Sequence, residues 1–338
     1  MPRISGPSPT GSVGDVPLLS AENLTKRFPV AGGIFGRPTA WVHAVEDISF
    51  TLGRGETLGL VGESGCGKST AGKTVLKLHE PTAGRIRVEG EDITALSPSR
   101  MRPYRRQMQI IFQDPYSSLN PRMTAGRIVG EPLLIHGIGK GGERRDRIAE
   151  LFRRVGMRPD QMRRYAHEFS GGQRQRLAIA RALAVNPKII VADESVSALD
   201  VSIQASVINL LIELQKEFNL SFLFISHDMS VIEHVSHRVA VMYLGTMVEV
   251  AGRRSIFSDP QHPYTEALLS AVPLPDPGAR NRKRRIMLTG EIPSPINPPS
   301  GCPFHTRCPY VKERCRVERP KIREIKPGHS AACHFPLG

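Results

Sequence analysis

The clearest chemical pattern in the sequence is a glycine-rich run between residues 62 and 69. It reads Gly-Glu-Ser-Gly-Cys-Gly-Lys-Ser and fits the phosphate-loop pattern G-x-x-x-x-G-K-[ST]. In such a loop, backbone N–H groups surround a β-phosphate, and the positive end of the following helix assists them. Lys68 is expected to neutralise charge on the β- and γ-phosphates, and the Ser69 hydroxyl to bind Mg²⁺. ATP with Mg²⁺ is therefore the expected ligand.

The flanks of this run supply the context that the pattern requires. The apolar segment Thr57–Val61 precedes it and predicts a buried strand, and helical spacing follows it. Cys66 has a simpler interpretation as a small space-filling side chain. The residues expected to contact the nucleotide are Gly62, Ser64, Gly65, Cys66, Gly67, Lys68, Ser69 and Thr70.

Two adjacent carboxylates, Asp193 and Glu194, follow another apolar run. Adjacent acids at the end of a strand are often a solvated turn, but the carboxyl ends of strands are also where open α/β sheets bind ligands. The phosphate loop favours the second interpretation. Asp193 is then expected to hold Mg²⁺ through its water shell, and Glu194 to polarise the attacking water.

The surrounding pattern predicts an α/β fold, because apolar strand-like runs alternate with segments of helical spacing. The expected buried strands are Thr57–Val61, Met108–Phe112, Ile189–Ala192 and Ser221–Ile225, and the expected helices are Ala71–Leu78, Gln173–Leu183 and Val201–Glu217. Between Asn120 and Glu168 the strand-like runs vanish, and an Arg-rich helical insertion is expected.

Composition and charge narrow the class of protein. The 338 residues are 40% hydrophobic and 23% charged, which is typical of a packed globular chain. Neither a signal-peptide pattern nor an apolar run of about 18 residues is present, so a cytoplasmic protein is expected. The formal net charge is +14, but the arginine-rich stretches 144–164 and 282–285 lack the interleaved aromatics that a base-stacking platform would need. Solvated arginine faces or a nearby membrane surface explain the charge better.

Four further motifs, in a fixed order, resemble those of ABC ATPases. Phe169–Gln173 resembles the signature motif, Ser197–Asp200 the D-loop, Gln113 the Q-loop and His227 the switch histidine. The resemblance implies catalytic roles for Glu194, His227 and Gln113, with Gln113 also near Mg²⁺. The further nucleotide contacts that it implies are Ser170, Gly171, Gly172, Gln173 and Asp200, with Phe28 stacking on adenine. Trp41 is an alternative for that stacking, and Ser195 stands where the family usually has proline.

The signature motif also predicts an assembly. Ser170 and the amides of Gly171 and Gly172 begin a helix and form a second phosphate cradle. One nucleotide does not need two cradles from one chain, so the family's head-to-tail pair of ATPase subunits is implied.

Longer segments narrow the resemblance to the second ATPase of bacterial oligopeptide and dipeptide importers. They are Val61–Thr70, Phe112–Tyr116, Ser118–Arg122, His262–Thr265 and Gly301–His334. The resemblance implies a heterodimer with another ABC ATPase, two transmembrane permease subunits, an extracytoplasmic solute-binding protein, and a peripheral place on the cytoplasmic face of the bacterial inner membrane. Peptide is the expected cargo, with nickel or another small solute as the alternative. A DNA-repair or translation ATPase is the rival class, but neither long coiled coils nor a second ATPase core is present, and no nucleic-acid partner is expected.

Four of the five cysteines lie close to the C-terminus: Cys302, Cys308, Cys315 and Cys333. Their spacings, C-x5-C, C-x6-C and C-x17-C, differ from the paired C-x2-C of most structural zinc sites. The resemblance implies a 4Fe-4S cluster here. Zinc stays open as the alternative, because His305, His329 and His334 lie near enough in sequence to replace a cysteine.

Together these expectations define a domain plan. The fold class is α/β, with a P-loop NTPase core of ABC type, an antiparallel β edge, a helical insertion and a cysteine-rich C-terminal extension. The expected boundaries are a flexible N-terminus at 1–18, the core at 19–119 and 169–258, the helical subdomain at 120–168 and the C-terminal extension at 259–338.

Overall fold

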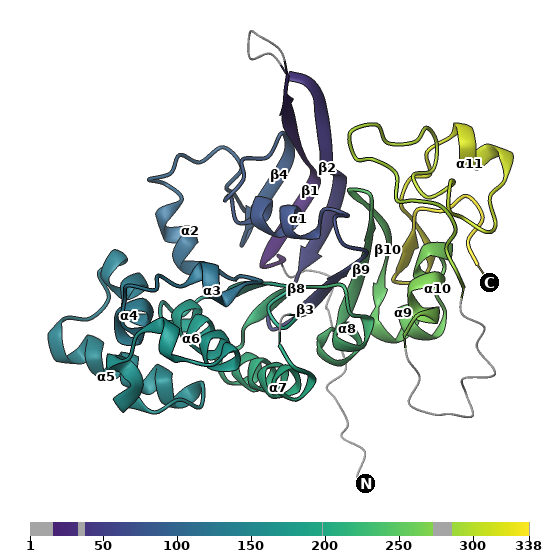
Figure 1. The fold of residues 1–338 in the computed structure, drawn as a ribbon. Helices are drawn as coiled ribbons and strands as arrows, with labels where there is room; N and C mark the ends of the chain where they lie inside the picture. Colours follow the sequence, from purple (N-terminus) through teal and green to yellow (C-terminus); the bar gives the residue numbers. More distant parts are fainter. Residues whose placement is uncertain (1–15, 33–37, 198, 273–285, 338) are drawn as a thin grey trace.

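A computed structural model describes residues 16–32, 38–197, 199–272 and 286–337 (Figure 1). Most of the flexible N-terminus predicted for 1–18, and Ala198 of the predicted D-loop, lie outside these residues. The core is an eight-stranded mixed sheet in the order β11-β12-β10-β9-β3-β8-β7-β6. Its strands are β3 (Thr57–Val61), β6 (Met108–Ile111), β7 (Ile189–Asp193), β8 (Ser221–Ser226), β9 (Arg238–Tyr243), β10 (Thr246–Gly252), β11 (Arg323–Lys326) and β12 (His329–Ala331).

The four predicted buried strands form a parallel block at one end of this sheet, with β6 at its edge. They are β3, β6, β7 and β8, and β9 continues the parallel pairing beyond β3. Side chains along β7 alternate between two cores: Ile190 lies in one apolar cluster and Val191 in the other. A strand buried on both faces reads as a continuous apolar run, which explains why these segments were recognisable in the sequence.

A second, antiparallel sheet confirms the expected antiparallel edge. Its order is β2-β1-β4-β5, with β1 at Leu19–Ala31, β2 at Pro38–Leu52, β4 at Ala83–Val88 and β5 at Glu91–Asp92. Ile48, Phe50 and Leu52 of β2 point to the core at every second position, as a half-buried strand requires.

Helices cover the sheet and form the helical insertion. They are α1 (Lys68–Val75), α2 (Arg102–Gln107), α3 (Pro115–Ser118), α4 (Ala125–Ile135), α5 (Gly141–Arg154), α6 (Gly171–Leu183), α7 (Val201–Phe218), α8 (Met229–Val235), α9 (Arg253–Ser258), α10 (Pro263–Ser270) and α11 (Glu313–Val317). The α5 helix buries Ile148, Leu151 and Phe152 and turns its arginines outward, so amphipathic spacing explains this Arg-rich helix. Within the described parts of the chain, no helix is both long and apolar enough to cross a membrane.

The C-terminal extension continues the core sheet. Strand β12 pairs antiparallel with β10, placing His329 opposite Ala251, and β11 pairs with β12. Figure 1 shows the last part of the extension, with α11, in yellow beside β10 and α10, at the end of the molecule opposite α4 and α5. The core therefore separates the helical insertion from the cysteine-bearing segment.

Candidate functional site

The phosphate loop connects β3 to α1, and its glycines are fixed by close backbone contacts. A Cβ on Gly62 would lie 2.1 Å from the carbonyl oxygen of Met242, and one on Gly67 would lie 2.0 Å from that of Ala44. Gly67 also has φ +103°, a conformation that favours glycine. Any side chain at either position would push the loop out of place.

Lys68 is the buried cation of this loop. Its side chain is 3% exposed, and its ammonium donates to the carbonyl oxygens of Gly62 at 2.8 Å and Glu63 at 2.9 Å. A buried ammonium needs such acceptors to offset its lost hydration. The lysine therefore stays inside the loop, where it can reach a phosphate.

Ser69 and Asp193 form the pair of oxygens expected to hold Mg²⁺. The Ser69 hydroxyl donates to Asp193 Oδ1 at 2.6 Å, although 124 residues separate the two in sequence. Burial raises the pKa of Asp193 above its ordinary value, while Ser69 and Lys73, whose Nζ lies 3.8 Å from Asp193 Oδ2, oppose that shift. Hydroxyl and carboxylate oxygens are the ligands that Mg²⁺ prefers, so the two residues fit the ion.

Glu194 is the point where the predicted catalytic residues meet. Gln113 donates to its Oε2 at 2.9 Å, and His227 Nδ1 lies 3.4 Å from the same oxygen. Lys68 Nζ lies 3.9 Å from Oε1. Residues from three separate segments thus surround one carboxylate, which is 11% exposed at the C-terminal edge of the sheet.

The backbone around Glu194 is strained. Its φ of +45° lies in the left-handed region, which non-glycine residues adopt at a cost, and such strain clusters at functional sites. Ser195, in the place usually held by proline, is 2% exposed, and its hydroxyl has no hydrogen-bond partner among the described residues. The turn after Glu194 therefore adopts this conformation without proline.

The signature residues lie at the start of α6. Ser170 caps this helix by accepting from the N–H of Gln173 at 3.4 Å, and the Gln173 side chain accepts from the Ser170 N–H at 3.1 Å. Among the described residues, no hydrogen bond or ion pair joins Ser170, Gly171, Gly172 or Gln173 to the phosphate loop. Asp200 is exposed immediately before α7.

The two aromatic candidates for adenine stacking lie on neighbouring strands. Phe28 of β1 is half-buried, its ring meets His79 edge-on at 5.3 Å, and the Lys26 ammonium lies 4.8 Å from its centre. Trp41 of β2 is 45% exposed. Adenine stacking on Phe28 stays a prediction.

The structure adds two residues that no motif indicated. Arg307, from the C-terminal extension, makes two hydrogen bonds to the carboxylate of Glu63 in the phosphate loop, at 2.6 and 3.0 Å. The hydroxyl of Tyr264 accepts from the Glu63 backbone N–H at 2.8 Å. Tyr264 belongs to the His262–Thr265 segment and Arg307 to the Gly301–His334 segment, but the sequence assigned no role to either residue. A contact across 244 residues leaves no local signal, so the pairing of Arg307 with Glu63 could not be found from the sequence.

All four C-terminal cysteines line one small cavity. Cys302, Cys308, Cys315 and Cys333 share it with Phe304 and Phe335, and none forms a disulfide. Burial raises the pKa of Cys302 and of Cys308 to about 11. Among the described residues, no group of three or more His, Cys, Asp or Glu side chains is arranged to hold a metal ion. The predicted cluster and its zinc alternative are therefore not demonstrated.

The three histidines proposed as replacement ligands have other partners. His305 Nδ1 lies 2.9 Å from the carbonyl oxygen of Cys302, and His334 Nε2 lies 2.9 Å from that of Glu318. His329 Nε2 lies 2.6 Å from a carboxylate oxygen of Glu249. These contacts make the histidines poorer candidates than the cysteines.

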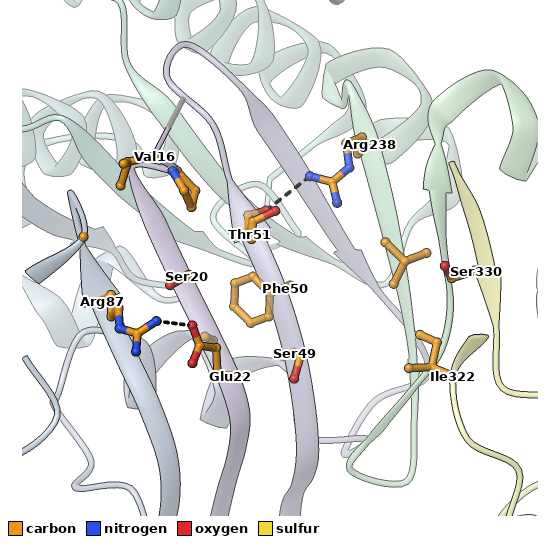
Figure 2. Close-up of a pocket in the computed structure, with 14 residues that line it drawn as sticks. Val16, Ser20, Glu22, Ser49, Phe50, Thr51, Arg87, Arg238, Ile322 and Ser330 are labelled. Atoms are coloured by element: carbon orange, nitrogen blue, oxygen red, sulfur yellow. Dashed lines mark hydrogen bonds and ion pairs between the residues drawn. The ribbon is translucent and has the colours of Figure 1, made fainter. Parts of the chain in front are cut away.

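A separate hollow lies where the two sheets approach the extension (Figure 2). Phe50 forms its floor, and Ile322 and Ser330 line the side of the extension. Its two arginines are both engaged: Arg87 with Glu22 at 2.6 Å, and Arg238 with the Thr51 carbonyl oxygen at 3.3 Å. None of the predicted site residues lines this hollow.

Two protein families match the chain. The family described as "ABC transporter" matches residues 45–197, and "Oligopeptide/dipeptide transporter, C-terminal region" matches 248–315. The oligopeptide transport ATP-binding protein AppF of Bacillus subtilis is 53% identical over 94% of this chain and 97% of its own length. A probable peptide ABC transporter ATP-binding protein of Sinorhizobium fredii, y4tS, is 54% identical over 94% of this chain and 89% of its own.

Solved structures show the same fold. A dimeric ATP-binding cassette, MJ0796, in a post-hydrolysis state with ADP and phosphate is 28% identical, with a TM-score of 0.62 over 70% of this chain and 99% of that one. The structure of cbiO1 from Clostridium perfringens, part of an ABC transporter complex, is 26% identical, with a TM-score of 0.61 over 72% of this chain and 91% of that one.

Proposed function

Because this chain belongs to the ATP-binding subunits of oligopeptide and dipeptide ABC transporters, we propose that its phosphate loop and Glu194 hydrolyse ATP at a site shared with a second ATPase. The chain is an ATPase that energises peptide import by an ABC transporter. The nickel cargo and the DNA-repair or translation alternative find no support among the relatives compared.

The convergence of Gln113, His227 and Lys68 on Glu194 carries the catalytic part of the proposal. Glu194 accepts a proton from the attacking water, and Gln113 and His227 orient its carboxylate. Lys68 and the loop amides bind the β- and γ-phosphates. Ser69 and Asp193 would hold Mg²⁺, which when bound neutralises phosphate charge; Gln113 is the third expected contact.

The second half of the site comes from another chain. The Ser170 cap at the start of α6 offers backbone N–H groups to an anion, and it makes no polar contact with this chain's own phosphate loop among the described residues. The solved cassette MJ0796 is dimeric. These observations support a head-to-tail pair in which Ser170, Gly171, Gly172, Gln173 and Asp200 complete the partner's nucleotide site.

The remaining subunits follow from the family. We infer a heterodimer in which this chain is the second ATPase, two transmembrane permease subunits, and an extracytoplasmic solute-binding protein. The assembly places the chain at the cytoplasmic face of the inner membrane. Its cargo class, dipeptide or longer peptide, is set by the other subunits.

We further propose that the four cysteines hold a 4Fe-4S cluster. Their shared cavity supports it, because the ligands of one cluster must converge on one point. A bound cluster would crosslink these segments and order the extension. Anaerobically purified chain is expected to be brown with about four irons, and Cys308→Ser to lose them while Cys66→Ser does not. One zinc per chain would favour the alternative, and no metal would refute both.

The test of the transport function is reconstitution. The chain, purified with its membrane subunits from detergent extracts, should support ATP-dependent peptide uptake into liposomes that contain the binding protein. The chain alone is expected to hydrolyse ATP slowly, with activity rising when the second ATPase is added. Rapid hydrolysis by a verified monomer, independent of its concentration, would contradict the shared site.

A further inference from the structure

The phosphate loop contains a carboxylate, whose negative charge would repel the phosphates that the loop is expected to bind. Glu63 lies between Gly62 and Ser64, in a loop that must surround a polyanion. An uncompensated carboxylate near the phosphates would weaken their binding by charge repulsion. Something must therefore neutralise Glu63 or hold it away.

Arg307 does both. Its guanidinium makes parallel hydrogen bonds of 2.6 and 3.0 Å to the two oxygens of Glu63, which is the strongest geometry for such a pair. The Arg307 side chain is only 7% exposed, and that of Glu63 is 26% exposed. A largely buried pair resists screening by salt and fixes the direction of the Glu63 side chain.

An aromatic cluster fixes the segment that carries Arg307 against the phosphate loop. Phe304, three residues before Arg307, packs against Tyr264 at 5.3 Å and Tyr243 at 5.2 Å. The Tyr264 hydroxyl accepts from the backbone N–H of Glu63. The segment between Cys302 and Cys308 is thus joined to both the backbone and the side chain of one phosphate-loop residue.

We propose that Arg307 is a positioning residue for ATP binding: the C-terminal extension neutralises and aims Glu63, and so keeps the phosphate loop competent for a triphosphate. This inference rests on the proposed role of residues 62–69 as the phosphate cradle. It gives the extension a direct part in nucleotide affinity, through a side chain that lies between two of its cysteines.

The test compares ATP binding by full-length variants, measured by displacement of a fluorescent ATP analogue in the presence of Mg²⁺. Arg307→Gln is expected to raise the Kd for ATP about tenfold, the factor for partly screened charges roughly 10 Å apart. The double variant Glu63→Gln/Arg307→Gln is expected to return within about threefold of wild type, because the repelling carboxylate is gone. A merely structural role predicts no such rescue.

A matched control is available in the same extension. Arg314 precedes Cys315 as Arg307 precedes Cys308, and it pairs through two hydrogen bonds with Glu318, but it is 55% exposed. Arg314→Gln should leave the Kd within about twofold, since screened surface pairs contribute little. Circular dichroism checks that each variant is folded.

Three outcomes would overturn the proposal: an unchanged Kd in folded Arg307→Gln, no recovery in the double variant, or an equal loss in Arg314→Gln. If Arg307→Gln does not fold, Arg307→Lys keeps the charge but cannot make both bonds, and it should raise the Kd about threefold. No change in that variant would also overturn the proposal.

Lys68→Ala distinguishes a failure of the phosphate-cradle assignment from a failure of the role proposed for Arg307. If it binds ATP normally, the phosphate-cradle assignment fails; if it loses ATP while Arg307→Gln does not, only the role of Arg307 fails.

Discussion

The phosphate edge, formed by residues 62–69 with Gln113, Asp193 and Glu194, and the C-terminal extension are built in different ways. At the phosphate edge, the functional groups lie at the ends of the three buried strands β3, β6 and β7, and the parallel sheet brings these ends together. The extension instead joins the core through the short strand β12, an aromatic cluster around Phe304, and a few polar contacts between residues that are distant in the sequence. Functional residues at the ends of buried strands can be predicted from the sequence. The contacts that attach the extension to the core cannot, because they join residues that are far apart in the sequence.

Besides its backbone pairing with β10, β12 is attached through one buried carboxylate. Glu249 of β10 is fully buried, and its carboxylate accepts from the backbone N–H groups of Gln261 at 2.6 Å and His262 at 3.0 Å. His329 of β12 lies 2.6 Å from the same carboxylate. A buried carboxylate is tolerated only when such partners surround it, so the three contacts act as a unit.

The largest expected effect belongs to the phosphate edge. Glu194→Gln should lower ATP turnover by the assembled transporter by about a thousandfold, because general-base catalysis contributes roughly 10²–10⁴. ATP binding should be retained, since the carboxylate does not touch the loop amides. Steady-state hydrolysis and equilibrium binding measure the two separately.

The control for this variant is Glu213→Gln, which changes an exposed carboxylate on α7. It should leave both turnover and binding unchanged. Turnover of Glu194→Gln within a fewfold of wild type would remove the catalytic assignment and, with it, the contrast between the two regions.

Most of the phosphate edge could be predicted because its residues are local to strands. Thr57–Val61 coincides with β3, and α1 begins at Lys68, three residues before the expected start, because the loop itself feeds the helix. Ser69 and Asp193 meet because β3 and β7 flank β8 in the parallel sheet, so their carboxyl ends lie at the same edge. The family and the ABC-type fold with its mixed sheet are confirmed; the individual residue roles stay predictions.

The extension could be predicted only in part. Its cysteines stand out by spacing, and they share one cavity. Nothing in the sequence indicated that β12 would extend the core sheet through β10, since β12 is only three residues long and has no alternating pattern. The pair of Arg307 with Glu63 was equally hidden, because no local pattern links a residue of the phosphate loop to one that lies 244 positions later.

An intermediate effect is expected where the extension joins the core. Glu249→Gln should lower the free energy of unfolding by about 2–3 kcal/mol, because the new amide NH₂ would face a backbone donor and leave buried groups unpaired. Glu266→Gln is the matched control, since Glu266 accepts only an exposed hydrogen bond from Tyr310 at 3.2 Å. Urea unfolding measures both, and limited proteolysis shows whether the extension detaches first. Equal stabilities of the two variants would mean that the Glu249 cluster does not anchor the extension.

The smallest expected effect is a pH dependence at the same junction. His262 is 1% exposed, and burial lowers the pKa of its imidazole to about 4. Its Nδ1 accepts from the Tyr264 N–H at 3.1 Å to cap α10, so the ring must stay neutral. The unfolded chain, with an ordinary histidine pKa near 6.5, takes up a proton first as the pH falls, so this contribution to stability is complete above about pH 6.5 and is lost progressively towards pH 4. Between pH 7 and 5.5 the loss in unfolding free energy should be about 1 kcal/mol.

His262→Asn removes the titration but keeps a capping oxygen. The difference in unfolding free energy between wild type and this variant should therefore change by that amount over the same range, and a difference independent of pH would show that the junction does not sense protons through His262.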